Sequence, residues 1–285
     1  MRIQRIGTVA GGQDGAIFGK ELFRLDHRGS CRVYDLSPLE GGGVPAAIGD
    51  FVLDRADLAV PHSNAVCFGV ERYAIEDRYP LLYTNIYNNC ASAAEPYLGT
   101  CCVYRILREK DRFSAHLVQL ITVDFCEDSD LWRASPEGHG VRPFGNFLVD
   151  TDTHSYYAYV MRSEPLGTRF FRFDLPSVIE GEIDPVLNVR RVMLRAEDIR
   201  EHFDMPFYRF IQGGIIHGGI LYSTEGFDQS RENPPAIRRV DLKKHTETYH
   251  DLPSLGIWEE PEMIDFCGDT CYYSDAGGHL YTVVF

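Results

Sequence analysis

Short apolar runs with alternating polar residues dominate the chain and predict an all-β protein. These runs are rich in Val, Ile, Tyr and Phe, and they are separated by Gly, Asp, Asn and Pro. Successive side chains of a strand point to opposite faces, so such alternation is typical of strands with one buried face. The segment 195–203 has helical spacing instead, with Ile199 and Phe203 four residues apart, and predicts a short helix in a loop insertion.

A strand that ends in Asp-Leu or a similar pair occurs four times at nearly constant spacing. The third residues of the four copies are Tyr34, Tyr104, Phe173 and Val240, which are 70, 69 and 67 residues apart, and a weaker fifth copy covers 279–283. Each copy follows a polar or Gly-rich start, an apolar strand and a second strand with an aromatic residue. Repetition at this period predicts a series of similar supersecondary units.

A fourth strand follows each of the first four copies, but the chain ends before a fifth one. The candidates for this fourth strand are 48–53, 117–121, 189–194 and 246–250. The N-terminal segment 2–9 is a spare strand, and it would complete the last unit. We therefore predict a five-bladed β-propeller over residues 1–285, a single domain closed by the N-terminal strand. A β-sandwich is the alternative, but it does not explain why the last repeat is one strand short.

Charge argues against polyanionic partners. The chain has 28 Lys and Arg residues against 42 Asp and Glu residues, a formal net charge of −14. Nucleic-acid binding takes most of its affinity from cationic side chains that neutralise phosphates, so we expect neither nucleic acid nor an anionic membrane surface as a partner. No run of about 18 apolar residues predicts a membrane span, and the N-terminus has no apolar stretch of the kind a signal peptide needs.

Cysteine usage predicts reduced thiols. The eight cysteines contain no Cys-x-x-Cys pair, and a chain of this size does not need a disulfide framework; they are Cys31, Cys67, Cys90, Cys101, Cys102, Cys126, Cys267 and Cys271. Cys267 and Cys271 flank a predicted hairpin turn, and no histidine-rich partner lies close to them in sequence, which argues against a zinc site. The pattern suits a reducing compartment, and we expect a cytoplasmic protein.

The starts of the inner strands carry the family resemblance. Gln-Gly at 212–213, His-x-Asn at 62–64 and Glu-Pro-Glu at 260–262, together with the Asp-Leu strand ends, resemble bacterial five-bladed propellers. These are related in shape to glutamine cyclotransferases and quinoprotein-like propellers. The resemblance extends over almost the whole chain and implies the fold far more than a function.

The same starts supply the candidate site. In a propeller the first residues of the innermost strands gather at one mouth of the central channel, and here they are polar where core strands are apolar. The predicted ligand-binding residues are Gln13, His62, Asn64, Asn146, Gln212 and Glu260, with Asp14 and Glu262 as candidate catalytic carboxyls. Tyr83, Tyr87 and Tyr208 are candidate stacking aromatics. The alternative is that the polar starts only line a hydrated channel.

We expect a propeller that binds a small polar molecule, foremost a carbohydrate, at this mouth. One alternative is glycoside hydrolysis, which needs one protonated and one ionised carboxyl, here Asp14 and Glu262. A second is a metal-assisted hydrolase that resembles lactonase-type propellers. That resemblance implies a calcium ion held by Glu262, Asn64, Asn146 and Asp14, although lactonase-type propellers have six blades. A third is a scaffold with a protein partner.

Overall fold

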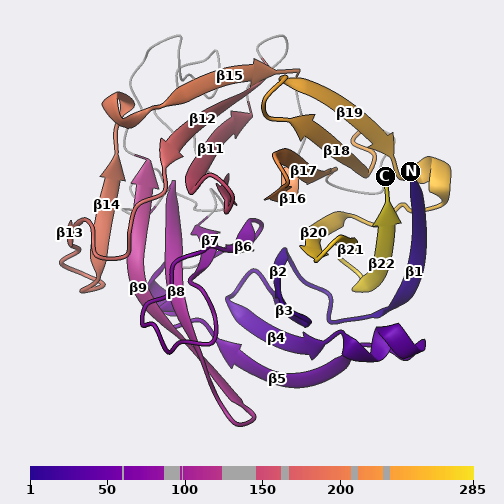
Figure 1. Ribbon diagram of the computed structural model, residues 1–285, viewed down its shortest axis with the longest axis horizontal. Coiled ribbons are helices and arrows are strands. Elements are labelled where there is room, and N and C mark those ends of the chain that lie inside the picture. The colour runs from indigo at the N-terminus through magenta and orange to yellow at the C-terminus, as the bar shows by residue number, and fades with distance from the viewer. Residues whose placement is uncertain are drawn as a thin grey trace.

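The computed structural model contains five β-sheets, four antiparallel and one mixed, arranged as blades around one axis (Figure 1). It describes residues 1–59, 61–86, 97, 99–123, 146–161, 167–206, 211–226 and 232–285. Four of the sheets have four strands and one has six. The predicted all-β, five-bladed propeller is therefore confirmed. None of the helices formed by the described residues has the length and apolar character to cross a membrane.

Each blade is built outward from an inner strand. From inner to outer strand, blade 1 consists of β2 (Gly15–Phe18), β3 (Glu21–Leu25), β4 (Ser30–Asp35) and β5 (Ala46–Val52), and blade 2 of β6 (Val66–Phe68), β7 (Leu82–Ile86), β8 (Thr100–Glu109) and β9 (Arg112–Val123). Blade 3 consists of β10 (Asn146–Asp150), β11 (Ser155–Met161), β12 (Thr168–Asp174) and β15 (Glu201–Met205), and blade 4 of β16 (Ile211–His217), β17 (Ile220–Glu225), β18 (Ala236–Asp241) and β19 (Thr246–Asp251). Blade 5 consists of β20 (Pro261–Cys267), β21 (Thr270–Asp275), β22 (His279–Val284) and the N-terminal β1 (Arg2–Thr8).

The N-terminal strand closes the ring, as the repeat pattern predicts. β1 pairs antiparallel with β22, from Arg2 opposite Val284 to Thr8 opposite His279. The two ends of the chain consequently lie next to each other on the outer side of blade 5 (Figure 1). The hairpin predicted between Cys267 and Cys271 is also present, because β20 and β21 are joined by a tight turn there.

Two sequence predictions around residue 195 are wrong. The segment 189–194 is not the outer strand of blade 3: β14 (Arg190–Leu194) runs parallel to β9 of blade 2, and β13 (Glu182–Ile183) extends that sheet to six strands. The predicted helix over 195–203 is instead a 3₁₀ turn, Ala196–Asp198, followed by β15. Phe203 and Met205 are buried, whereas His202 and Asp204 are exposed. Burial therefore alternates with a period of two residues, as in a strand with one buried face.

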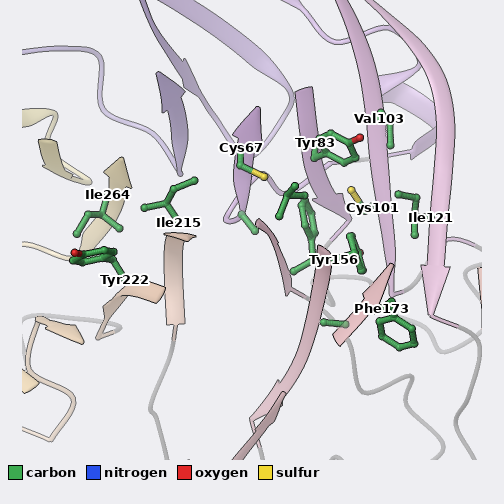
Figure 2. Close-up of a cluster of buried hydrophobic side chains, with 14 of the residues drawn as sticks. Cys67, Tyr83, Cys101, Val103, Ile121, Tyr156, Phe173, Ile215, Tyr222 and Ile264 are labelled. Carbon is green, nitrogen blue, oxygen red and sulfur yellow. The ribbon is translucent and has the colours of Figure 1, made fainter. Parts of the chain in front are cut away.

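The core consists of apolar side chains packed between neighbouring blades. One large cluster joins blades 2 and 3 through Tyr83, Cys101 and Tyr156, and continues around the axis to Ile215 and Ile264 (Figure 2). The described cysteines are all free thiols, most of them buried, in keeping with their predicted role as small apolar side chains. Cys90 and Cys126 lie outside the described residues. Helical structure in the described segments is limited to α1 (Ala56–Ala59), η1 (Ser37–Gly41), η2 (Ala196–Asp198) and η3 (Pro253–Leu255).

Candidate functional site

The predicted mouth residues lie at the starts of the five inner strands, as expected. The inner strands β2, β6, β16 and β20 surround the middle of the ring in Figure 1. The inner strands of neighbouring blades lie close together, β16 beside β20, β10 beside β16, β2 beside β20, and β2 beside β6. Polar side chains from separate blades can therefore come into direct contact.

A chain of side-chain amides links blades 2, 3 and 4. The side-chain nitrogen of Asn85, at the end of β7, donates hydrogen bonds to the Oδ1 atoms of Asn64 and Asn146, the latter at 2.7 Å. Asn146 in turn donates to the backbone carbonyl of Ile211 in blade 4, at 3.2 Å. The Oδ1 atom of Asn85 accepts from the backbone N–H of Ala65. These buried amides satisfy one another and hold three blades in register.

Other predicted residues join the remaining blades. The side chain of Gln212 donates to Glu260 of blade 5 and to the carbonyl of Gly226. A carboxyl oxygen of Asp14 accepts from the backbone N–H of Val66 in blade 2, at 2.9 Å. Many of the polar side chains at the mouth therefore hold neighbouring blades together.

Three charged side chains from blades 1 and 5 form a buried cluster in this mouth. Asp14 is fully buried, and both Arg24, near the end of β3, and Glu262 are 2% exposed. Arg24 donates from Nη2 to the carbonyls of Gly12 and Asp275, at 3.2 Å each, and so ties blade 1 to blade 5. We call Asp14, Arg24 and Glu262 the mouth cluster.

Gly213 of blade 4 lies against the mouth cluster. A Cβ atom at this position would be 2.2 Å from the carbonyl oxygen of Glu262 and 3.0 Å from the carboxyl carbon of Asp14. Only glycine permits so close an approach of blades 1, 4 and 5. The Gln-Gly pair at 212–213 is therefore needed for packing as well as for polarity.

Burial governs the electrostatics of the cluster. Desolvation raises the pKa of Asp14 well above its usual value, against the opposing hydrogen bonds from Val66 and Gly15. Desolvation likewise raises the pKa of Glu262, which Arg24 only partly offsets. For Arg24 burial lowers the pKa, while Glu262, Asp14 and Asp275 act in the opposite direction. Both carboxyls consequently tend toward their neutral, hydrogen-bond-donating form.

Several polar atoms of the mouth cluster have no hydrogen-bond partner among the described residues. They are Oδ1 of Asp14, Nε and Nη1 of Arg24, and Oε2 of Glu262. Buried polar atoms in native proteins are nearly always paired, and leaving one unpaired costs about 1 to 3 kcal/mol. The cluster therefore has unused capacity for donors and acceptors supplied from outside the chain.

A cleft of about 370 Å³ adjoins Arg24 on the mouth side of blade 1. Its polar walls come from Arg24, Asp26, Ser30, Arg32 and Asp50. Arg24 thus belongs both to the buried cluster and to the cleft. The cleft also includes Ala10 and Gly11, which precede blade 1.

A histidine–aspartate pair occupies the neighbouring turn of blade 5. Asp275 is fully buried, and its carboxyl oxygens lie 2.9 Å from Nδ1 and from the backbone nitrogen of His279. Because the carbonyl of Asp275 also accepts from Arg24, this pair is coupled to the mouth cluster through the backbone.

Gln13 and His62 lie at the edge of the mouth and are only partly buried. The backbone N–H of Gln13 donates to Leu25, and that of His62 donates to Asn85. Partial burial lowers the pKa of the His62 imidazole, and His27 acts in the same direction. Tyr83 is fully buried and packs in the core, so it is not available to stack on a ligand, whereas Tyr87 and Tyr208 lie outside the described residues.

Structural comparison supports the fold. A scan against protein-family models and a search of curated proteins gave no match. The glutaminyl cyclase of Myxococcus xanthus superposes with a TM-score of 0.52 at 9% identity, over 100% of this chain and 94% of that one. The two proteins share a fold. Virginiamycin B lyase from Staphylococcus aureus gives a TM-score of 0.44 at 11% identity, covering 99% and 98% of the two chains.

Hydrazine synthase from Kuenenia stuttgartiensis gives a TM-score of 0.40 at 10% identity. The match covers 92% of this chain but only 61% of that one. At these identities the likeness to glutaminyl cyclase confirms the shape resemblance expected from the sequence, and it carries no activity over to this chain.

The predicted calcium ligands are largely engaged with the protein. The Oδ1 atoms of Asn64 and Asn146 both accept from Asn85, and one oxygen of Asp14 accepts from Val66. Within the segments that the structure describes, no three His, Cys, Asp or Glu side chains gather closely enough for a metal ion. A calcium ion bound by these residues would have to compete with these internal hydrogen bonds.

Sequence analysis missed the residues at the ends of the second strands. Arg24, Asn85, Glu225 and Asp275 are all buried at this position in their blades. A pattern was available, since Thr84-Asn85, Thr224-Glu225 and Ser274-Asp275 each place a hydroxyl residue before a carboxyl or amide.

Proposed function

We propose that the protein binds a small polar ligand, a carbohydrate foremost, at the mouth of the channel between blades 1 and 5. The observation that carries this proposal is the mouth cluster, whose buried polar atoms include four without a partner in the described chain. The cleft beside Arg24 provides the space for such a ligand. Binding sites of this kind are concave and present a few converging polar groups.

The chemistry of the cluster favours a ligand with several hydroxyl groups. Arg24 offers two nitrogen atoms with unused N–H donors, and the carboxyls of Asp14 and Glu262 are shifted toward their neutral form by burial. A protonated carboxyl both donates and accepts, as a hydroxyl group does. The walls of the cleft add the carboxylates of Asp26 and Asp50 and the guanidinium of Arg32. Sugars match this mixture of donors and acceptors.

Thermal stabilisation by ligands tests the proposal. The purified protein is screened against neutral sugars, sugar acids and lactones, each with calcium or with a chelator. A ligand at 100 times its dissociation constant stabilises by about 2.7 kcal/mol, which moves the melting temperature of a domain of this size by several degrees. The expected result is a shift with a sugar that is weakened in Asp50→Ala, an exposed residue of the cleft, and in Glu262→Gln.

The screen also separates the competing interpretations. A shift with no sugar, or one unaffected by both variants, would refute binding at this mouth. Stabilisation by calcium alone would favour the metal-assisted hydrolase over simple binding. Glycoside hydrolysis by Asp14 and Glu262 ranks below binding, because burial raises the pKa of both carboxyls whereas hydrolysis needs one of them ionised.

A second candidate function is protein interaction, and a separate observation favours it. A groove of about 510 Å³ lies beside the six-stranded sheet, and its walls include Tyr73, Ile179 and Ile183. Ile179 is 74% exposed and Ile183 56% exposed. Exposed apolar surface of this kind is typical of interaction sites. Sedimentation across a range of protein concentrations tests self-association at this groove, and Ile179→Glu should abolish any association that uses it.

A further inference from the structure

A second polar pocket lies at the opposite end of blade 1 from the mouth. It has a volume of about 340 Å³ and is located at the turn between β2 and β3, where blade 1 meets blade 2. Its charged residues are Lys20, Glu21, Asp35, Arg78 and Arg108. We call it the turn pocket. The pocket contains three cations and two carboxylates, whereas the whole chain has an excess of acidic residues and a net charge of −14.

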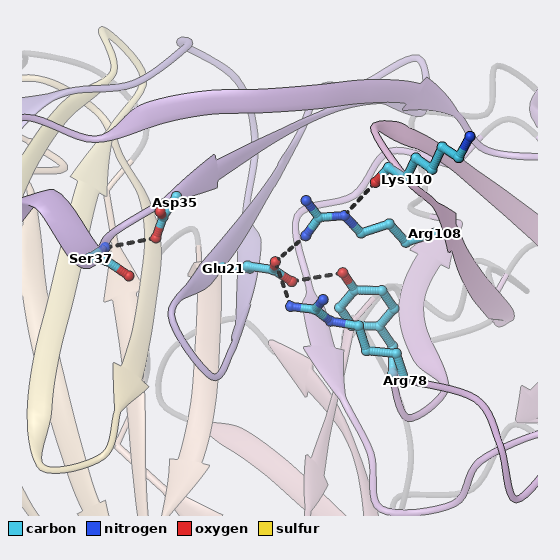
Figure 3. Close-up of polar contacts among 7 residues, drawn as sticks. Glu21, Asp35, Ser37, Arg78, Arg108 and Lys110 are labelled. Atoms are coloured by element: carbon cyan, nitrogen blue, oxygen red, sulfur yellow. Dashed lines mark hydrogen bonds and ion pairs between the residues drawn. The ribbon is translucent and has the colours of Figure 1, made fainter.

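Glu21 organises the cations of the turn pocket (Figure 3). Its Oε1 atom accepts hydrogen bonds from both Arg78, at 2.8 Å, and Arg108. Its Oε2 atom accepts from the hydroxyl of Tyr79, at 2.7 Å. One carboxylate therefore lies between two guanidinium groups, so the three side chains together retain one positive charge.

The other acidic side chain of the pocket is engaged elsewhere. Asp35 accepts a hydrogen bond from the backbone N–H of Ser37, at 2.8 Å (Figure 3). The hydrogen bonds from Ser37 are the main cause of the lowered pKa of Asp35, and Lys20 and Arg108 lower it further. Lys20 itself pairs with the exposed Glu40 at 2.7 Å, an interaction that solvent weakens.

Packing fixes the two guanidinium groups in place. Arg108 lies 5.0 Å from the ring centroid of Phe113, and its Nε atom donates to the carbonyl of Lys110. Arg78 lies 5.4 Å from the ring centroid of Tyr79. Its Nε and Nη1 atoms have no hydrogen bond to the described residues, and its side chain is 58% exposed. Arginine held in this way offers its unused donors to a ligand at little entropic cost.

We propose that the turn pocket binds a small oxyanion, such as phosphate or the phosphoryl group of a monoester, between Arg78, Arg108 and Lys20. Guanidinium groups bind such anions through paired, charge-assisted hydrogen bonds. The two guanidinium groups on Glu21 supply the attraction, in competition with the nearby carboxylates of Asp35 and Glu40, and the unused donors of Arg78 supply the hydrogen bonds. This site is independent of the proposed sugar site at the other end of the same strands.

Titration with inorganic phosphate in low-salt buffer tests the site, with sulfate and a simple phosphate monoester titrated in parallel. Binding is measured by calorimetry and by the phosphorus NMR signal. Arg78→Ala is the main variant, because Arg78 is largely exposed and Arg108 continues to pair with Glu21. The expected loss of affinity is about tenfold or more, the usual effect of removing a charge-assisted hydrogen bond.

Three further variants make the result specific. Glu21→Gln removes the carboxylate that competes with the anion, so it should tighten phosphate binding. Arg200→Ala removes an equally exposed arginine of an ion pair in blade 3 and should leave phosphate affinity unchanged. Glu262→Gln should also leave it unchanged, which separates this site from the mouth.

Absence of binding by the wild-type protein for all three anions would overturn the proposal. So would phosphate binding that is equally strong in Arg78→Ala, because the anion would then lie elsewhere. Weaker binding in Arg78→Ala with intact binding in Arg200→Ala would support the turn pocket even if the mouth proved to bind no sugar.

Discussion

The two ends of the β2–β3 hairpin place charged residues in opposite situations. At the mouth, Asp14 and Arg24 are almost completely buried, and several of their polar atoms have no partner in the described chain. At the turn, Glu21 uses both carboxyl oxygens, while Arg78 remains largely exposed. β3 spans only the five residues Glu21–Leu25, yet the environments at its two ends differ in solvent access and in charge balance.

The difference indicates how each end can act. A buried group without a partner loses the solvation of water and gains little in return, so a ligand that pairs with it would bind strongly and selectively. An exposed arginine keeps its solvation, so a ligand at the turn gains mainly from charge and depends on ionic strength. We therefore expect the mouth to determine selectivity and the turn to respond to salt.

Arg24→Ala tests the buried mouth end of the hairpin and should have the largest effect on the free energy of unfolding. Removing the buried guanidinium takes away its interaction with Asp14 and Glu262 and breaks two hydrogen bonds, of which the one to Asp275 joins blade 5 to blade 1. We expect a loss of about 3 to 5 kcal/mol in the free energy of unfolding, measured by urea denaturation. The matched control is Arg32→Ala, because Arg32 is exposed and lies directly opposite Arg24 in the sheet. Similar losses for both variants would contradict the comparison.

Asp265, a buried carboxyl of the inner strand β20, should make the stability of the protein depend on pH. Burial raises its pKa to about 7, although the backbone N–H groups of Ile17 and Phe266 donate to its carboxyl. The folded state therefore holds the proton more tightly than the unfolded state does. Its contribution to stability is fully present below the unfolded pKa of about 3.9 and is lost as the pH rises through about 7.

Urea denaturation between pH 5 and pH 8 measures this dependence. We expect the contribution of Asp265 to fall by roughly 2 to 4 kcal/mol across the titration. Asp265→Asn should flatten the decline, and the part that remains should come from Asp14 and Glu262, whose pKa values burial also raises. Parallel profiles for wild type and variant would show that the buried carboxyl does not titrate in this range.

Glu21→Gln tests the other end of the hairpin and should have a smaller effect. The variant keeps a side-chain oxygen as an acceptor but removes the charge that Arg78 and Arg108 share. We expect a loss of about 1 to 2 kcal/mol in the free energy of unfolding at low salt. Repeating the denaturation at high salt should reduce this loss, because ions screen the repulsion between the arginines. A loss as large as that of Arg24→Ala would refute the distinction between the two ends.

The fold was predictable because its determinants are local and repeated. Alternating strands recur with similar spacing from Tyr34 to Val240, and the missing last strand is supplied by 2–9. The exchange between β14 and β15 was not predictable in this way. The segment 189–194 has strand-like character whereas 195–203 has helical spacing, and in the fold Leu194 and Phe203 pack in different hydrophobic clusters. Spacing alone does not distinguish these partners.

The position of the candidate site in the fold was predictable from the sequence, but the contacts between its residues were not. The inner-strand starts gather at the mouth because the propeller places them there. Asn85 contacts Asn146 across 61 residues of sequence, and Arg24 contacts Asp275 across 251 residues. The local pattern at Thr84-Asn85 and Ser274-Asp275 marks such residues, but their partners depend on how the blades pack around the ring.

Arg78→Ala should have the smallest effect on stability and sharpens the comparison most. Its ion pair with Glu21 is exposed on the arginine side, and Arg108 remains to neutralise the carboxylate. Exposed ion pairs contribute about 0 to 1 kcal/mol, so the melting temperature should stay within a few degrees of wild type. Arg108→Ala is the matched variant, because Arg108 is 21% exposed and also packs on Phe113. It should be the less stable of the two. Wild-type stability of both variants would mean that Glu21 needs neither arginine, and the charge between them would then no longer account for an anion site.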